Sequence, residues 1–412
     1  MEPSALNSIE IAKPEYYAEH GYPHDAWAML RRTAPVFRYE RPGLDPFWAV
    51  TKHADIVEVS RQPELYRSDQ ALFITPKESQ TPDVILHQLL NMNPPEHPEY
   101  RGVTSHRFTP RALRERLTAR IEEIAAEVLD AVVDREECDF VTDLSARFPL
   151  AVIAEMFGAP RSDWDLLIRL SNELVGAGDP EYNRGENQND ALQRARMEFF
   201  EYFSGLIEDR RKHPHDDIST VLVNGQVDGS PMPAFELLSY FALLIVAGNE
   251  TTRNATTGGL YAFINNPEQW ERLKRDPSLA RWAAEEVLRW TSPVIHFLRV
   301  ATADTELHGQ KIRKNDTLAL YYPSANRDEE VFEDPYRFDI GRNPNPHIAF
   351  GIGEHFCLGA NLARVELQVM LRQLSERLEQ VELAGPISRL RANFIGGIKH
   401  MPIRYKMRPR KH

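Results

Sequence analysis

The chain has 412 residues, a length that can bury a large core and enclose a bulky ligand. Its net charge of −12 argues against nucleic acid as the main partner, because binding to phosphates needs a basic face. Two cysteines give no disulfide framework, which indicates a reducing cytoplasm.

In chain order, the N-terminus lacks the basic and apolar regions of a signal peptide, and residues 34–62 carry β-favouring runs split by a Pro-Gly turn signal. Long helical patterns follow, a second β-rich stretch covers 297–323, and the last strand signal lies at 402–407. The most apolar run, 241–247, is far shorter than the roughly 20 residues that cross a bilayer. The expected helices cover 110–135, 145–157, 161–176, 190–212, 234–265, 267–275, 278–291 and 360–374.

These elements predict a mainly α-helical (α+β) fold with small β-sheets built from distant segments. Because no linker, repeat or change of composition marks a boundary, we expect a single domain over residues 1–412. Two long irregular segments, 68–93 and 176–190, are typical of lids or binding loops.

The expected helix over 234–265 changes character at "AGNETT" (247–252), where one bulky face becomes small and then hydroxylated. Gly in a helix interior costs about 1 kcal/mol and a Thr hydroxyl can draw a carbonyl from its helical partner, so we expect a locally opened helix. Small residues at a helix crossing would explain the same pattern, but the acid–alcohol pair Glu250–Thr251 suits proton delivery. Arg253 should point away, since it lies roughly 200° round the helix at ~100° per residue. The residues of this face are Phe241, Leu244, Ile245, Gly248, Thr251, Thr252 and Ala255.

Cys357 lies in a glycine-rich loop, residues 350–359, directly before a helical pattern. A thiol there meets unpaired backbone N–H groups and the positive end of the helix dipole, which favour thiolate over thiol. Gly353 and Gly359 remove side chains near the sulfur, so that a flat, bulky group can approach. A thiolate reached by a planar macrocycle is one of the few ways to hold haem iron. A lone cysteine is more often a small buried hydrophobe, which is how we interpret Cys138.

This loop resembles the haem-binding loop of the cytochrome P450 family, which reads Phe, two residues, Gly, then His or Arg two before Cys, then Gly. Phe350, Gly353, His355, Cys357 and Gly359 fill every one of these positions. The resemblance spans about 90 to 400, with all signatures in the family's order. It implies a cytochrome P450 fold with a helical core around haem b, whose iron takes Cys357 as its axial thiolate ligand.

The same resemblance implies roles for two further motifs. Glu250 and Thr251 are implied to serve oxygen activation, with Glu in place of the commoner Asp. Glu286 and Arg289 are three apart on one helix, a spacing that alone indicates a solvated surface pair. By resemblance they belong to a buried ion-pair trio with a structural role, completed by Arg337 of "DPYRF".

A haem also needs cations for its two propionates. His97 and Arg101 in "PPEHPEYR" are four residues apart, on one face if helical. Asn93 precedes them where many relatives have Asp. The propionate partners that the resemblance implies are His97, Arg101, Arg299 and His355.

The family inserts one atom of dioxygen into an organic substrate with two electrons. No flavin or nicotinamide domain is present, so the resemblance implies electrons from a ferredoxin and a ferredoxin reductase, delivered to a monomer. An acidic ferredoxin needs a basic patch near the cysteine, although a solvated helix face explains the candidate residues equally well. These candidates are His106, Arg107, Arg111 and Arg114.

The expected substrate pocket has an apolar wall with few fixed charges, which suits a hydrophobic molecule of terpenoid, steroid or lipid type. His296 faces this pocket or the opposite side. A peroxide-driven haem-thiolate hydroxylase and a non-catalytic haem sensor or ligand-binding protein remain alternatives. The candidate lining residues are Leu72, Phe73, Ile74, Leu244, Ala247, Gly248, Val294, Ile295, Phe297, Phe394 and Ile395.

Overall fold

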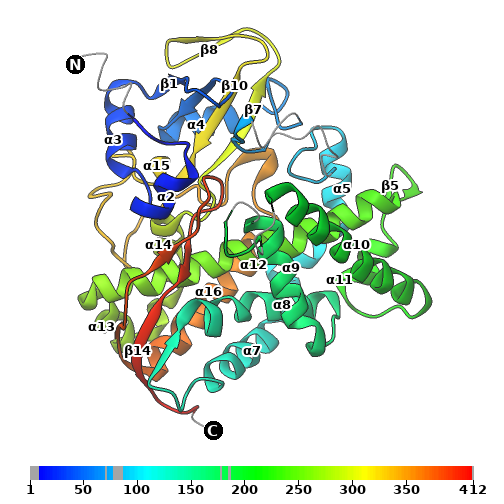
Figure 1. Ribbon diagram of the computed structural model, residues 1–412, viewed down its shortest axis with the longest axis vertical. Helices are drawn as coiled ribbons and strands as arrows, with labels where there is room; N and C mark the ends of the chain where they lie inside the picture. Colours follow the sequence, from blue (N-terminus) through cyan, green and yellow to red (C-terminus); the bar gives the residue numbers. More distant parts are fainter. Residues whose placement is uncertain (1–8, 70–71, 78–86, 177–178, 184–186, 411–412) are drawn as a thin grey trace.

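The computed structural model describes residues 9–69, 72–77, 87–176, 179–183 and 187–410. They form a large helical part and a smaller part built on a β-sheet (Figure 1). The expected mainly α-helical fold with small sheets is confirmed. Within the described residues, no helix is both long and apolar enough to cross a membrane.

The smaller part is organised by a five-stranded sheet with the order β1-β2-β10-β7-β3. β10 pairs with β2 in parallel and with β7 antiparallel, so segments from both ends of the chain share one sheet. The strands are β1 (Val36–Tyr39), β2 (Phe47–Val50), β3 (Tyr66–Arg67), β7 (His296–Ala301) and β10 (Thr317–Tyr321). The helices beside it are α2 (Pro14–His20), α3 (His24–Thr33), α4 (His53–Ser60) and α15 (Tyr322–Ala325).

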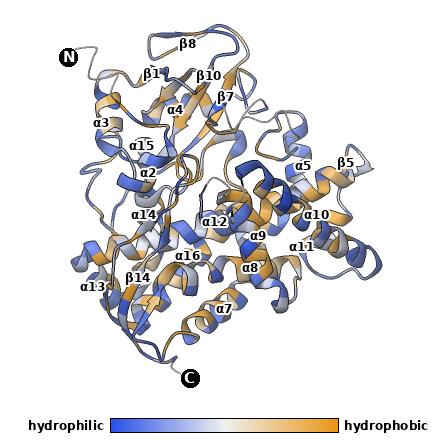
Figure 2. Ribbon diagram, in the orientation of Figure 1, coloured by the Kyte–Doolittle hydropathy of each residue, from blue (hydrophilic) through white to orange (hydrophobic). Residues whose placement is uncertain are grey.

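The helical part is centred on α12 (Ala234–Asn265), which contacts α8, α9, α14 and α16. The apolar colouring of α8 and α12 marks this core in Figure 2. The other helices are α5 (Glu96–Ser105), α6 (Pro110–Arg116), α7 (Thr118–Asp130), α8 (Arg147–Phe157), α9 (Trp164–Gly176), α10 (Gln188–Lys212), α11 (Ile218–Val223), α13 (Pro267–Arg275), α14 (Ala280–Thr291) and α16 (Ala360–Arg377). Short 3-10 or π turns are η2 (His106–Phe108), η3 (Val141–Ser145), η4 (Arg161–Asp163), η5 (Pro277–Leu279) and η6 (Gly353–His355).

Smaller sheets complete the fold. The three-stranded one has the order β11-β14-β4 and brings the last strand beside a strand from the middle of the chain. Its strands are β4 (Glu137–Asp139), β11 (Leu378–Leu383) and β14 (Pro402–Met407). The two-stranded sheets pair β5 (Gln226–Val227) with β6 (Ser230–Pro231), β8 (Thr305–Leu307) with β9 (Gln310–Ile312), and β12 (Ser388–Arg389) with β13 (Ile398–His400).

Three predicted elements, α12, α13 and β14, have the expected bounds. The expected helix 110–135 is broken at Leu117 into α6 and α7. The stretch 34–62 was expected to carry β-favouring runs split by a Pro-Gly turn, but its end forms α4. There, Ile56 and Val59 lie three apart and are both buried, so packing of one helix face outweighs their preference for strands. Both expected lid segments lie partly outside the described residues.

Candidate active site

The cysteine loop presents Cys357 just before the first turn of α16. The backbone N–H of Cys357 donates to the carbonyl of Phe350 at 2.9 Å, and its own carbonyl accepts from the N–H of Ala360 at 3.3 Å. The Phe350 ring packs against the guanidinium of Arg364, 4.6 Å from its centroid. The loop is therefore held on both sides of the sulfur.

Gly353 and Gly359 of this loop have different surroundings. Gly353 has a φ of +74°, and a Cβ there would lie 2.3 Å from the carbonyl oxygen of Ser60 in α4. Gly353 is thus required by the backbone turn and by its contact with α4, not by access to the sulfur, which corrects our expectation. A Cβ on Gly359 would meet nothing within 4 Å, so that side of the loop has open space.

The protonation of Cys357 differs from the sequence-based expectation. Burial raises the pKa of its thiol, and the opposing effects of the Gly359 N–H, Arg101 and Arg364 are smaller. The start of a helix is therefore not sufficient to ionise this thiol. A bound cation would do so, because coordination to a metal deprotonates a thiol outright.

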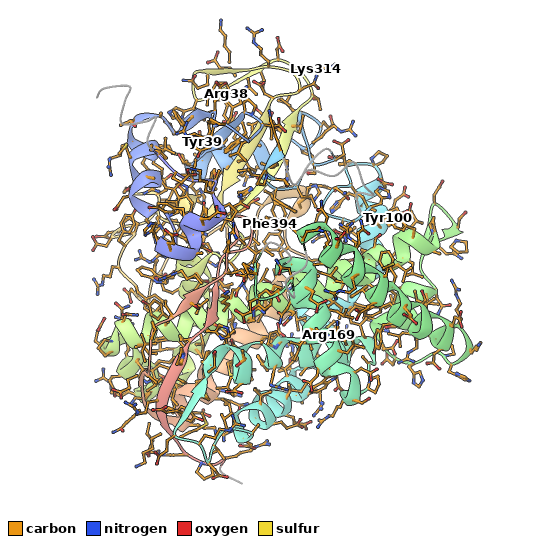
Figure 3. The ribbon with its side chains drawn as sticks, in the orientation of Figure 1. Arg38, Tyr39, Tyr100, Arg169, Lys314 and Phe394 are labelled. Carbon is orange, nitrogen blue, oxygen red and sulfur yellow. The ribbon has the colours of Figure 1, made fainter. Side chains whose placement is uncertain are left out.

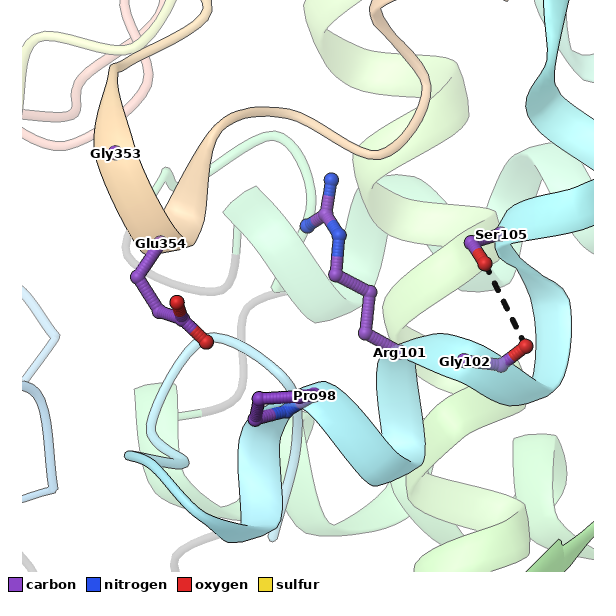
Figure 4. A pocket seen from close by; sticks show the side chains of 6 residues that line it. All are labelled: Pro98, Arg101, Gly102, Ser105, Gly353 and Glu354. Atoms are coloured by element: carbon purple, nitrogen blue, oxygen red, sulfur yellow. Dashed lines mark hydrogen bonds between the residues drawn. The ribbon is translucent and has the colours of Figure 1, made fainter.

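Two histidine and two arginine side chains lie together beside the cysteine loop. The rings of His97 and His355 are 4.6 Å apart between centroids, and Nδ1 of His97 lies 2.6 Å from Oε1 of Glu354. Burial, with Arg299, His97 and Arg101 nearby, lowers the pKa of His355 to about 2. In Figure 4, Arg101 extends from α5 toward the segment that carries Gly353 and Glu354. The structure brings all four predicted propionate partners together.

Arg299 provides a test of whether a haem fits. Its side chain is buried, and burial lowers its pKa. Its Nη1 donates to the carbonyl of Leu298 at 2.7 Å, and no carboxylate among the described residues pairs with it. A buried guanidinium without a counter-ion is costly, and a bound carboxylate would supply one. The residues present therefore fit a haem whose propionates face this cluster.

The middle of α12 is open on one side. Leu244 and Ile245 are buried, whereas Ala247 is exposed and Thr251 is partly so. The Thr251 hydroxyl donates to the carbonyl of Ala247 at 2.7 Å. The helix is continuous from Ala234 to Asn265, so the expected opening is not a break in the helix.

Glu250 and Arg253 form a buried ion pair, which corrects the expectation that Arg253 points away. An i,i+3 spacing brings them together on the side of α12 that faces α9. Arg253 Nη1 also donates to Oδ1 of Asn172 at 2.6 Å. Burial raises the pKa of Glu250, while Arg253 and Ser171 oppose that shift.

Thr252 does not share the environment of Thr251. It is buried, and its hydroxyl lies 3.5 Å from Oε2 of Glu366 in α16. Burial raises the pKa of Glu366 well above its usual value. We did not predict a role for Glu366, although the sequence carries a signal: it falls at helical spacing between the apolar residues Leu362 and Met370.

The buried trio contains a different arginine from the one expected. Glu286 and Arg289 are fully buried and form a bidentate pair at 2.7 and 2.8 Å. The third cation is Arg342, 3.3 Å from Glu286, whereas the side chain of Arg337 is exposed. Arg337 contributes only its carbonyl, which accepts from both Arg289 and Arg342.

The predicted substrate-lining segments converge. Phe73 and Phe394 stack at 4.6 Å, and Phe297 meets Phe394 edge-on at 5.3 Å. Val294 pairs with Ile395 in an isolated bridge, and the N–H of Leu298 donates to the carbonyl of Leu72. Phe394 lies where the sheet part meets the helical part (Figure 3).

Not every residue of that set is accessible. Ile74 and Ile295 are buried in the cluster that includes Trp27 and Tyr321. His296 is also buried, and its Nε2 accepts the N–H of Ile74 at 3.0 Å. His296 therefore attaches the segment 72–77 to β7.

The candidate basic patch is partly neutralised. Arg107 and Arg116 both pair with Asp216, and Arg111 pairs with Glu115. His106, Arg107 and Arg111 line one surface depression, whereas Arg114 does not.

Comparisons with known proteins agree with this geometry. A family model described as Cytochrome P450 matches residues 181–383. Cytochrome P450-terp of Pseudomonas sp is 36% identical over 96% of both chains, and the steroid C26-monooxygenase of Rhodococcus jostii is 38% identical over 98% of this chain and 86% of the relative. The methyl-branched lipid omega-hydroxylase of Mycobacterium tuberculosis is 37% identical over 97% and 95%. The crystal structure of CYP108D1 from Novosphingobium aromaticivorans superposes with a TM-score of 0.88 at 33% identity, covering 99% of this chain and 100% of that one.

Proposed function

The chain belongs to the cytochrome P450 family of haem-thiolate monooxygenases, and we propose that this member oxidises a hydrophobic substrate of terpenoid, steroid or lipid type. The observation that carries the substrate class is the aromatic wall formed by Phe73, Phe297 and Phe394. Its stacked rings offer a large apolar surface, and the charged groups of the site lie elsewhere. The names of relatives, a P450-terp, a steroid C26-monooxygenase and a methyl-branched lipid omega-hydroxylase, support the same class.

Cys357 is the proposed iron ligand, and Arg101, Arg299, His97 and His355 are the proposed partners of the haem propionates. The bound haem supplies the chemistry by which one atom of O2 is inserted into the substrate and the other leaves as water. Arg299 is buried and has no counter-ion in the part of the chain that the structure describes, so it supplies a charge for a propionate to neutralise. Phe350 and Gly359 shape the loop on the cysteine side of the ring.

Thr251 and Glu250 are proposed to handle protons. The Thr251 hydroxyl lies at the exposed part of α12, where it donates to the carbonyl of Ala247 and can still accept a hydrogen bond from a water. Glu250, one residue earlier, can take a proton from solvent and pass it on. Ala247 lies on the exposed part of the same helix and leaves space for the substrate. The expected pocket positions of Leu244 and Gly248 are corrected, because Leu244 is buried and a Cβ on Gly248 would meet the side chain of Ile153 in α8.

Electrons are proposed to come from a ferredoxin and its reductase. The surface around Arg107 and Arg111 supports this, because its ion pairs to Asp216 and Glu115 are exposed. Exposed pairs are worth about 0–1 kcal/mol, so an acidic partner can replace those carboxylates. Electron transfer should then slow as salt is raised.

A peroxide-driven hydroxylase is the second candidate, because an arginine, Arg253, lies beside Glu250. Both terminal nitrogens of Arg253 are engaged, one with Glu250 and one with Asn172, so the guanidinium faces α9. This arrangement favours the O2-dependent reaction.

The test is a screen of terpenoids, steroids and branched fatty acids for a low-to-high-spin change of the ferric haem. Compounds that bind are then incubated with ferredoxin, reductase and reduced nicotinamide, or with hydrogen peroxide alone. Product in the first reaction supports the proposal. Product with peroxide alone supports the second candidate. Hydrophilic compounds of similar size are screened beside the hydrophobic ones, and a spin change with the hydrophilic compounds alone would refute the substrate class.

A further inference from the structure

One face of the five-stranded sheet points toward the cysteine loop. Arg299 of β7 lies opposite Leu318 of β10, and side chains of directly opposite residues share a face of the sheet. The next pair on this face is Phe297 with Leu320. The face packs on α4, and α4 in turn contacts η6 of the cysteine loop. Side chains on this face therefore lie on the haem side of the sheet.

Tyr322 continues this face directly after the end of β10. It packs in the same apolar cluster as Leu318 and Leu320. Its ring meets the ring of Phe297 edge-on, 6.3 Å between centroids, and its backbone N–H donates to the carbonyl of Ile295 at 3.1 Å. The backbone and the ring of Tyr322 are thus both held in place, so its phenol has little freedom to turn.

The hydroxyl of Tyr322 is a buried donor without an acceptor. The residue is 3% exposed, and its hydroxyl makes no hydrogen bond with any residue that the structure describes. Burial raises the pKa of Tyr322, and the nearby Arg299 opposes that shift without cancelling it, so the phenol stays protonated beside the guanidinium. Buried hydroxyl groups in proteins nearly always have a hydrogen-bond partner, so this one needs an explanation.

Arg299 and Tyr322 together offer what one carboxylate group needs. Arg299 gives one nitrogen to the carbonyl of Leu298 and has no carboxylate partner within the described ranges of the chain. A carboxylate has two oxygens and can accept from a guanidinium and from a hydroxyl at once. A water molecule would satisfy the hydroxyl of Tyr322 but would leave the charge of Arg299 uncompensated.

We propose that Tyr322 is a further haem-binding residue, whose hydroxyl donates to the same propionate that Arg299 neutralises. The hydrogen bond helps to retain the haem from the side of the sheet. The other propionate is then left to the groups of α5 and of the cysteine loop, which are His97, Arg101 and His355. The inference rests on the proposed assignment of Arg299 to a propionate.

Resonance Raman spectra of the ferric holoprotein test this role without turnover, because the bending band of the haem propionates responds to the hydrogen bonds that their carboxylates accept. Tyr322→Phe keeps the ring and its contact with Phe297 and removes only the hydroxyl. We expect the band to shift to lower frequency in Tyr322→Phe. Transfer of haem to excess apomyoglobin should become about tenfold faster, the order expected for loss of one hydrogen bond to a charged group.

Two further variants make the test specific. Tyr321→Phe is the matched control, since Tyr321 lies on the opposite face of the sheet and its hydroxyl donates to the carbonyl of Ile11 at 3.1 Å. It should leave both the band and the rate of haem transfer unchanged. A ring-fluorinated tyrosine in place of Tyr322 is a stronger donor and should shift the band in the opposite direction from Tyr322→Phe.

An unchanged band in Tyr322→Phe, or equal shifts in Tyr322→Phe and Tyr321→Phe, would overturn the inference. If Tyr322→Phe yields no holoprotein, the fluorinated variant decides alone, and an unchanged band in it also overturns the inference. Arg299→Lys separates this failure from that of the proposed site. A shift in Arg299→Lys without one in Tyr322→Phe refutes the role of Tyr322 alone, whereas no shift in either variant refutes the assignment of Arg299 to a propionate as well.

Discussion

The buried ion-pair trio gives the sharpest test of how this fold is stabilised. The sequence predicted Arg337 as its third member, whereas the structure has Arg342 at that place. Glu286 accepts from Arg289 twice, from the N–H of Asp339 at 2.9 Å and from Asn345 at 3.1 Å. Replacing it by Gln keeps the shape and removes the charge opposite a fully buried Arg289. Leaving one member of such a pair uncompensated costs about 3–5 kcal/mol.

Arg342 and Arg337 should differ clearly in how much each contributes to the free energy of unfolding. Arg342 lies 3.3 Å from Glu286 with its side chain 10% exposed, and it also donates to the carbonyls of Glu333, Asp334 and Arg337. Those carbonyls are near solvent and can be rehydrated, so we expect Arg342→Gln to cost about 1–3 kcal/mol. Arg337 is exposed, and Arg337→Gln should lie within about 0.5 kcal/mol of the parent.

Urea unfolding followed by circular dichroism measures these free energies, and the haem absorbance of purified protein reports haem loading. The expected order of loss is Glu286→Gln, then Arg342→Gln, then Arg337→Gln. If Arg337→Gln destabilises the protein as much as Arg342→Gln, our assignment of the trio is wrong.

Three other predictions concern the site and its surroundings. Thr251→Ala should keep folding, haem binding and the substrate-induced spin change, while product per reducing equivalent falls and hydrogen peroxide rises. Thr252→Ala should have a smaller effect on this coupling, and equal coupling in Thr251→Ala and the parent would contradict the role of Thr251 in proton delivery. Burial raises the pKa of Glu285, but hydrogen bonds from His347 and Arg364 outweigh it and lower the pKa to about 2 from 4.5. Because this pKa is depressed in the folded state, the ionised Glu285 contributes up to about 3 kcal/mol to the free energy of unfolding above pH 4.5, and this contribution is lost as the pH falls toward 2. The difference in free energy of unfolding between the parent and Glu285→Gln, measured in urea, should therefore shrink from pH 4.5 to 2. A constant difference would contradict this role of Glu285. Phe394→Ala, which removes the ring stacked on Phe73, should weaken the spin change with bulky terpenoids in a titration, whereas Phe235→Ala, at an exposed position on α12, should not.

Signatures of fixed local spacing could be predicted from the sequence. The loop from Phe350 to Gly359 carries its own geometry, because a positive φ at Gly353 and the hydrogen bond from Cys357 to Phe350 depend on neighbouring residues. The bounds of α12 followed in the same way from one long apolar period.

Side-chain direction was harder to predict. A helical face is broad, so spacing alone could not separate Thr251, which is partly exposed, from Thr252, which is buried against α16. The pairing of Arg253 with Glu250 follows from their i,i+3 spacing, which we overlooked because we compared the direction of Arg253 with that of Thr251. In the irregular segment before the cysteine, no periodicity indicates whether Arg337 or Arg342 points inward.

The expected ionisation of Cys357 depends on a contribution that the sequence does not show. The helix start and nearby arginines favour the thiolate, but burial raises the pKa of this thiol by more. The nearby charges can be read from the sequence, but the desolvation of the thiol depends on how deeply the fold buries it, which the sequence does not give.

The central claim is that Cys357 is the ligand of a haem iron. The absorption spectrum of the reduced protein with carbon monoxide tests it most directly, measured for the parent, Cys357→Ser and the control Cys138→Ser. We expect the red-shifted band of thiolate-ligated haem in the parent and in Cys138→Ser, and its loss in Cys357→Ser. A spectrum like that of a histidine-ligated globin in the parent, or an unchanged band in Cys357→Ser, would contradict the claim.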